Sequence, residues 1–129
     1  MTATANLYLR NARIVAENAQ FLGGIAVREG KIATVIEGDQ DIPAEKTIDL
    51  QGQVVFPGII DSHVHFNDPG RTHWEGMRTG SLAAAAGGVT TIVDMPLNNL
   101  PAVVNHEILQ SKLDAVKPRA LVDFALYGG

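Results

Sequence analysis

Hydrophobic and polar positions follow two different rhythms in the two halves of the chain. Up to about residue 53, short apolar or alternating runs are separated by polar or glycine-containing turns, which is typical of antiparallel β-structure. Beyond that point the pattern predicts strand, helix, strand, helix, strand, as in a parallel sheet with crossover helices. We therefore expect an α/β fold, with part of a small β-sandwich domain at residues 1–53 and a second domain at residues 54–129.

The first half is expected to hold three or four short antiparallel strands, among them residues 7–15, 24–27 and 31–36. A tight hairpin turn is predicted at Glu29-Gly30, because glycine tolerates the positive φ that such turns need. Residues 39–46 are polar and are interpreted as a connecting loop. The segments 47–50 and 53–56 are then expected to form another strand pair across a turn at Gln51-Gly52.

The second half begins with a strand that ends at two histidines, His63 and His65. A helix at residues 72–86 is expected to stop at the following Gly-Gly pair, and a β-branched strand to follow at residues 89–95. Asn105 is the predicted N-cap of a second helix. A third strand is predicted at residues 120–127.

Composition narrows the class of protein. The chain has 129 residues, of which 46% are hydrophobic and 19% charged, enough apolar material for a core and no signature of disorder. A net charge of −4 gives no basic footprint for nucleic acid, and no apolar run is long enough for a membrane span. The start of the chain lacks the pattern of a secretory signal and cysteine is absent, so a cytoplasmic location is expected.

The candidate chemistry lies at the end of the first strand of the second half. Alternate residues of a strand project to the same face, so His63 and His65 are placed to bind one metal ion together. Asp61 shares that face two residues earlier. It could accept a hydrogen bond from a ligating imidazole and fix its tautomer.

Several segments together resemble a known family. They are Pro-Gly-Ile-Ile-Asp-Ser-His-Val-His at 57–65, Gly-Gly-Val-Thr-Thr at 87–91 and the β-rich segment before them. This combination is similar to the N-terminal part of the cyclic amidohydrolases of the urease-related superfamily. Within that group, the segments 67–76 and 94–98 most resemble the allantoinases.

The resemblance implies a (β/α)₈ TIM barrel, which needs about 250 residues, so we expect roughly its first three strands here. It also implies hydrolysis of the cyclic amide of allantoin to allantoate, in ureide catabolism, at a binuclear centre of two zinc ions. His63 and His65 would hold one ion, and Asn98 and Arg71 are candidate substrate-binding residues. The other ligands and the catalytic aspartate are expected beyond Gly129. The full-length enzyme is expected to form a homo-oligomer, and this fragment alone to be inactive.

Alternatives remain open at this point. A doubly wound open sheet has the same strand and helix pattern as a partial barrel. A hydantoinase or dihydropyrimidinase, a dihydroorotase, and a non-catalytic dihydropyrimidinase-like scaffold are the rival functions. Dihydroorotases typically place an arginine two positions after the second histidine to bind a substrate carboxylate. Here that position is Asn67, which cannot supply a charge-assisted contact.

Three other residues receive a structural interpretation. Arg71 has an alternative role as the ion-pair partner of Glu75 four residues later. Trp74 is interpreted as a packing residue rather than a substrate platform. Lys112 falls within the second predicted helix, away from any strand end, so it is not assigned as a bridging metal ligand.

Overall fold

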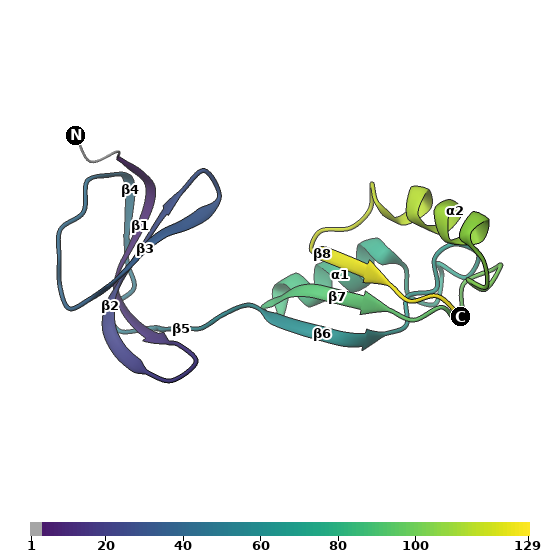
Figure 1. Ribbon diagram of the computed structural model, residues 1–129, viewed down its shortest axis with the longest axis horizontal. Helices are drawn as coiled ribbons and strands as arrows, with labels where there is room; N and C mark the ends of the chain where they lie inside the picture. Colours follow the sequence, from purple (N-terminus) through teal and green to yellow (C-terminus); the bar gives the residue numbers. More distant parts are fainter. Residues whose placement is uncertain (1–3) are drawn as a thin grey trace. The chain divides into compact units, whose positions relative to one another are not determined.

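The computed structural model describes residues 4–129, and the chain divides into two compact units between Pro57 and Gly58. The first unit is a β-sheet and the second consists of three parallel strands with two helices (Figure 1). Each unit has hydrophobic clusters of its own. Within residues 4–129, no helix is both long and apolar enough to cross a membrane.

The first unit is a single sheet with the strand order β3-β2-β1-β4, in which β5 also pairs with β1. Its strands are β1 (Ala5–Val15), β2 (Gln20–Arg28), β3 (Lys31–Glu37), β4 (Ala44–Asp49) and β5 (Val54–Val55). The expected antiparallel pairing of the first three strands is confirmed. Glu29 and Gly30 form the predicted hairpin turn with φ of 51° and 73°, as a two-residue type I′ turn requires.

The expected strand pair across Gln51-Gly52 is wrong. Strands β4 and β5 run in the same direction, and each pairs in parallel with β1. The reason lies at Asn11, where the register of β1 shifts and φ is 53°. Asn11 accepts a hydrogen bond from the Gly52 backbone N–H and donates one to Asp49. The turn at Gln51-Gly52 therefore does not reverse the chain, and β5 continues along β1 in the same direction as β4.

The second unit alternates strands and helices as predicted, with β6, β7 and β8 side by side in one parallel sheet (Figure 1). Its elements are β6 (Ile59–Val64), α1 (Met77–Ala86), β7 (Val89–Asp94), α2 (His106–Val116) and β8 (Asp123–Leu126). Ile92, in the central strand, is fully buried in one cluster with Met77 of α1 and Val116 of α2. Both helices therefore cover the same face of the sheet.

The first helix starts five residues later than predicted. Residues 72–74 form turns, and α1 begins at Met77 after an N-cap at Gly76. The competing interaction comes from Asp68, whose carboxylate accepts hydrogen bonds from the Thr72 hydroxyl and the Met77 backbone N–H. Side chains that bond nearby backbone groups in this way stabilise turns at the expense of helix.

The second helix begins where the sequence predicts. The side chain of Asn105 accepts a hydrogen bond from the backbone N–H of Ile108 at 2.9 Å, the expected contact of an N-cap. The helix ends at Val116, before Pro118. The predicted stop of α1 at Gly87-Gly88 is also confirmed, with Gly88 at a φ of 82°.

Candidate metal centre

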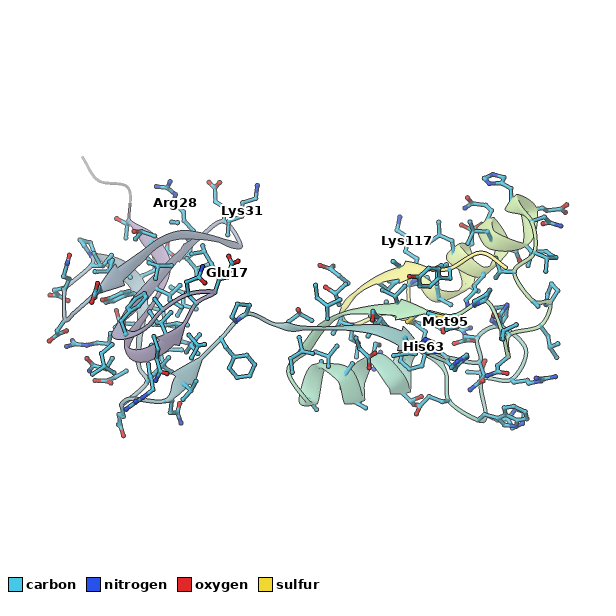
Figure 2. All side chains as sticks on the ribbon, turned by 60° about the horizontal axis from the view of Figure 1, so that its bottom comes forward. Glu17, Arg28, Lys31, His63, Met95 and Lys117 are labelled. Carbon is cyan, nitrogen blue, oxygen red and sulfur yellow. The ribbon has the colours of Figure 1, made fainter. Side chains whose placement is uncertain are left out.

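The two histidines of the His-x-His pair lie together at the carboxyl end of β6. Val64 packs against the cluster under the helices, so the neighbouring positions 63 and 65 face the other side of the sheet. His63 Nε2 and His65 Nε2 are 3.2 Å apart, and both rings are exposed. Figure 2 shows His63 near the end of its strand. The structure therefore brings the two predicted ligands to one point.

This spacing suits a shared metal ion. Two nitrogen ligands at about 2.0–2.1 Å from a tetrahedral zinc ion lie about 3.3 Å from each other, close to the observed separation of 3.2 Å. Within residues 4–129, no group of three or more His, Cys, Asp or Glu side chains is arranged to hold a metal. Among the described residues, the two histidines are therefore the candidate donors, and a four-ligand site would need further ones.

Asp61 occupies a different position from the one expected. Its Oδ1 accepts a hydrogen bond from the backbone N–H of His63 at 3.1 Å, whereas a bond to an imidazole ring was expected. Among the described residues, no hydrogen bond joins Asp61 to either ring. In this structure Asp61 acts on the backbone at His63, and its contact with a ligating ring remains a prediction.

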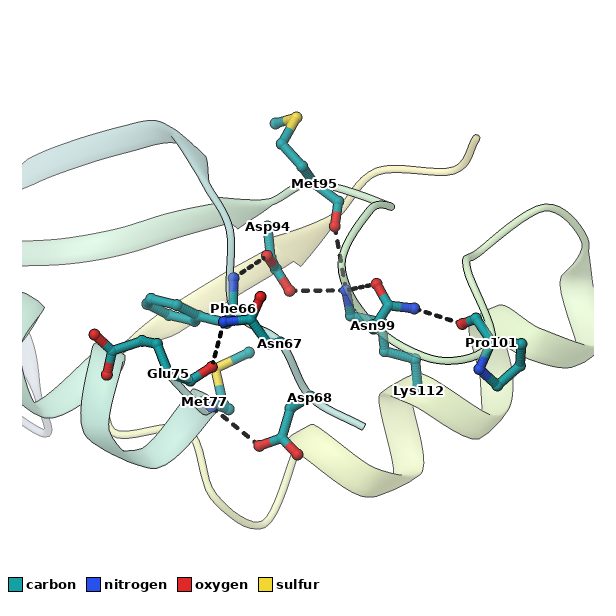
Figure 3. Close-up of polar contacts among 10 residues, drawn as sticks. All are labelled: Phe66, Asn67, Asp68, Glu75, Met77, Asp94, Met95, Asn99, Pro101 and Lys112. Carbon is teal, nitrogen blue, oxygen red and sulfur yellow. Dashed lines mark hydrogen bonds and ion pairs between the residues drawn. The ribbon is translucent and has the colours of Figure 1, made fainter. Parts of the chain in front are cut away.

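A buried ion pair lies behind the histidines, on the helix side of the sheet. Asp94, the last residue of β7, accepts a hydrogen bond from the Phe66 backbone N–H through Oδ1 at 2.8 Å. Its Oδ2 lies 2.8 Å from Lys112 Nζ, and the two side chains are 0% and 1% exposed. Figure 3 shows this carboxylate between Phe66 and Lys112. The pair therefore joins α2 to the residue that follows His65.

Burial is the main influence on the Asp94 carboxyl. Removal from water raises its pKa, although hydrogen bonds from Lys112 and Phe66 and the positive charge of Lys112 act in the opposite direction. Oδ1 accepts a hydrogen bond and Oδ2 is compensated by the ion pair with Lys112, so each oxygen has a polar partner. The carboxylate therefore connects the backbone at Phe66 to Lys112.

Lys112 has a structural role that was not predicted from the sequence. Its exclusion as a bridging metal ligand stays a prediction, and in the structure its ammonium is buried among oxygen acceptors. A signal was present in the sequence. Lys112 lies four residues from both Ile108 and Val116, on the apolar side of α2, where a charged residue needs a buried partner.

The loop after the histidines is held by two buried side chains. Asn67 donates from Nδ2 to the Glu75 backbone carbonyl at 3.0 Å, closing the loop across its base. Asp68 is 1% exposed and also forms an ion pair of 2.8 Å with Arg119. Burial acts to raise the pKa of Asp68, but hydrogen bonds from Thr72, the Met77 backbone and Arg119 outweigh it and hold the pKa below its usual value.

Arg71 does not make the ion pair with Glu75 given as its alternative role. Within residues 4–129 the guanidinium lies over the Trp74 ring instead, 5.0 Å from its centroid, at a distance typical of a cation–π contact. Trp74 is 63% exposed within residues 4–129, so its packing role stays a prediction for the full-length protein. Arg71 remains a candidate for substrate binding.

Asn98 lies in the exposed loop after β7 with φ of 71°, a left-handed conformation that asparagine tolerates better than most residues. Its neighbour Asn99 is buried. Asn99 accepts a hydrogen bond from Lys112 Nζ at 3.0 Å and donates one to the Pro101 carbonyl. The loop is thereby anchored one residue away from the candidate substrate contact.

Comparison with known proteins agrees with this geometry. Residues 54–128 match the family model described as the amidohydrolase family. The chain is 44% identical over 124 residues to the allantoinase of Salmonella choleraesuis, a match that covers 96% of this chain and 27% of that protein. The allantoinase of Salmonella paratyphi B matches to the same extent. The chain thus spans about a quarter of the length of these curated relatives.

Solved structures give the same picture for the fold. The L-hydantoinase (dihydropyrimidinase) from Arthrobacter aurescens matches with a TM-score of 0.89 and 34% identity, over 98% of this chain and 28% of that one. The D-hydantoinase (dihydropyrimidinase) from Thermus sp. matches with a TM-score of 0.75 and 25% identity, over 94% and 27% of the two chains. The fold class and the resemblance predicted from the sequence are confirmed by these matches.

Proposed function

Because this chain belongs to the amidohydrolase family, we propose that it forms the N-terminal part of a full-length allantoinase, a metal-dependent enzyme that opens the ring of allantoin to give allantoate. The observation that carries the proposal is the pairing of His63 and His65 at 3.2 Å in a chain that is 44% identical to an allantoinase over nearly its whole length. The full-length protein would act in ureide catabolism in the cytoplasm.

The histidines are the residues that would hold a divalent metal ion, and we propose zinc. In this family such an ion polarises the amide carbonyl and activates water for hydrolysis. The contribution of this chain is to present two imidazoles on one strand face and to fix the backbone around them through Asp61 and Asp94. Two ions per site, a catalytic aspartate and the remaining ligands would come from later barrel strands of the full-length protein.

Substrate choice would depend on the loops beside the histidines. Arg71 and Asn98 are both positioned on such loops and carry hydrogen-bond donors suited to the carbonyl groups of a ureide ring. Asn67 stands where dihydroorotases have an arginine, and its side chain is committed to the Glu75 carbonyl. A carboxylate substrate such as dihydroorotate would therefore lack its cationic partner at this position.

Hydantoin hydrolysis is the second candidate, because the structural match to the Arthrobacter aurescens L-hydantoinase has a TM-score of 0.89. The two candidates share the same metal chemistry and differ in the ring that is opened. The sequence identity of 44% to allantoinases, against 34% to this hydantoinase, favours allantoin. A scaffold without metal chemistry is disfavoured by the presence of both histidines.

A substrate panel tests this proposal. The zinc-loaded full-length protein should be assayed for kcat/KM with allantoin, hydantoin, dihydrouracil and dihydroorotate, because specificity is the ratio of these constants. Allantoin should give the highest value and dihydroorotate the lowest. A higher kcat/KM for hydantoin or dihydrouracil would transfer the assignment to a hydantoinase, and turnover of none of the four would favour the non-catalytic scaffold.

A further inference from the structure

The ammonium of Lys112 is buried at the centre of a set of oxygen acceptors. The side chain is 1% exposed, and Nζ lies 2.8 Å from Asp94 Oδ2, 3.0 Å from Asn99 Oδ1 and 3.3 Å from the Met95 carbonyl oxygen. The ammonium therefore makes two hydrogen bonds, to Asn99 and Met95, and one ion pair, with Asp94. Figure 3 shows the three acceptors around this one nitrogen.

These acceptors belong to the end of β7 and to the loop that follows it. Asp94 and Met95 are consecutive residues at the carboxyl end of the strand, and Asn99 lies in the loop that contains Asn98. The Lys112 ammonium therefore contacts both the end of β7 and the following loop, at the edge of the sheet where the candidate metal centre lies.

The connection continues from Asp94 to the histidine strand. Asp94 Oδ1 accepts the hydrogen bond from the Phe66 backbone N–H at 2.8 Å, and Phe66 is the residue directly after His65. The backbone of His65 is thus linked to Lys112 through a single carboxylate. On the other side, Asn99 links the same ammonium to the residue next to Asn98.

Stability alone is a weak explanation for this arrangement. A buried ion pair often contributes little net stability compared with apolar side chains of similar volume, because both charges lose their hydration. Here α2 packs through an apolar face in which Ile108 and Val116 occupy the equivalent positions one turn away. What a methionine at position 112 could not provide is a donor that orients Asp94 and Asn99.

We propose that Lys112 is a positioning residue of the candidate metal centre, which fixes His65 through Asp94 and Phe66 and fixes Asn98 through Asn99. The inference rests on the proposed metal-dependent function of the full-length protein. It adds a role in α2, on the face of the sheet opposite to the histidines, for a residue that touches neither metal nor substrate.

The test compares Lys112→Met with Lys117→Met in the full-length protein. Lys117 is an exposed lysine at the end of the same helix and is the matched control. Zinc affinity should be measured by competition with a chelator, the absorption spectrum of the cobalt(II)-substituted protein recorded, and kcat and KM for allantoin determined at saturating zinc. Lys112→Met should weaken zinc binding by about 10- to 100-fold, as loss of partners behind metal ligands does.

We also expect Lys112→Met to change the cobalt(II) spectrum and to raise the KM for allantoin, because both His65 and Asn98 lose their support. Lys117→Met should match the wild type in every measurement. If Lys112→Met is folded and its zinc affinity and cobalt(II) spectrum equal those of Lys117→Met, the positioning role is wrong and Lys112 only packs.

A second variant covers the case in which Lys112→Met fails to fold because Asp94 is left buried without its partner. Asp94→Asn/Lys112→Met removes both charges of this buried pair, and the amide oxygen of the asparagine can still accept the Phe66 N–H. It should fold and still bind zinc at least tenfold more weakly than the wild type. Wild-type zinc affinity in this double variant would overturn the inference.

The outcomes also separate this inference from the proposed function. A wild-type protein that binds zinc without opening allantoin, while Lys112→Met binds zinc more weakly, would refute the proposed substrate and support the positioning role. A wild-type protein that opens allantoin, with unchanged zinc affinity in Lys112→Met, would support the proposed substrate and refute the positioning role. A wild-type protein that binds no zinc would refute both.

Discussion

At the scale of single residues, Gly80 determines how closely α1 approaches the segment that follows His65. A Cβ at this position would overlap the ring of Phe66, which is itself buried. Gly80→Ala should therefore destabilise the second unit by about 1 to 3 kcal/mol, as overpacking of a core does, despite the better helix propensity of alanine. Thermal melting of the full-length protein checks this prediction.

Gly87→Ala is the matched control, because an added Cβ there would meet only ordinary contacts at 3.5 Å and its φ is −86°. It should melt within a few degrees of the wild type. Equal melting temperatures for the two alanine variants would contradict the close contact between Gly80 and Phe66.

Asp68 should make stability depend on pH in the acid range. Its pKa in the folded protein lies below the ordinary value of 3.8, so its stabilising contribution is complete above that value and is lost as pH falls through the folded pKa. Asp68→Asn should be less stable than the wild type at pH 7, and the difference should narrow as the pH falls from about 4 towards 3. Melting temperatures measured across this range provide the check.

Asp123→Asn, at an exposed position on β8, serves as the control. Its melting temperature should change with pH in the same way as that of the wild type. A constant difference between Asp68→Asn and the wild type down to pH 3 would show that the carboxylate charge is not what Asp68 contributes.

Residue-level prediction from sequence succeeded where the cause is local. The proximity of His63 and His65 follows from the alternation of side chains along a strand, so their spacing in the sequence is enough to predict it. The partners of Lys112 could not, because they lie 13 to 18 residues away along the chain and meet only when α2 packs on β7. The position of Arg71 over Trp74 was missed because the i,i+4 rule assumes a helix, and residues 72–74 form turns.

At the scale of elements, the N-cap of α2 offers a simple test of the helix that carries Lys112. Asn105 accepts the Ile108 backbone N–H, and its replacement by alanine typically costs about 1 kcal/mol. Asn105→Ala should lower the melting temperature, and Asn105→Asp, which keeps the acceptor, should not. Equal losses in both variants would mean that the cap contributes through something other than this hydrogen bond.

Element boundaries were predictable where periodicity and terminators agree, as at the hairpin of Glu29-Gly30 and the end of α1. They failed where side chains from elsewhere compete for the backbone. Through its hydrogen bond to Met77, Asp68 favours a helix start at Met77 rather than at residue 72. Through its contact with Gly52, Asn11 favours the parallel pairing of β4 and β5 with β1. Neither contact has a periodic signature that a sequence pattern could reveal.

At the scale of the whole molecule, the isolated 129-residue chain should be a poor enzyme. In the sheet of the second unit, β6 and β8 each pair only with β7 among the described strands, which leaves two unpaired edges that favour association. On the proposed function, the two histidines would supply only two of the four ligands of a zinc site. We expect weak zinc retention, no hydrolysis of allantoin, and self-association in analytical ultracentrifugation.

A full-length sample prepared in parallel is the control for that experiment. A monodisperse 129-residue monomer that hydrolyses allantoin in a metal-dependent way would show that this chain contains a complete site and that the partial barrel proposed for it is wrong.

The central claim is that His63 and His65 hold a catalytic metal ion, and zinc content together with allantoin hydrolysis in His63→Ala/His65→Ala tests it most directly. His106→Ala, at the exposed first residue of α2, is the control and should keep both properties. The account predicts a folded double variant with at least one zinc ion fewer per chain than the wild type and no allantoin hydrolysis. Wild-type zinc content and activity in that variant would contradict it.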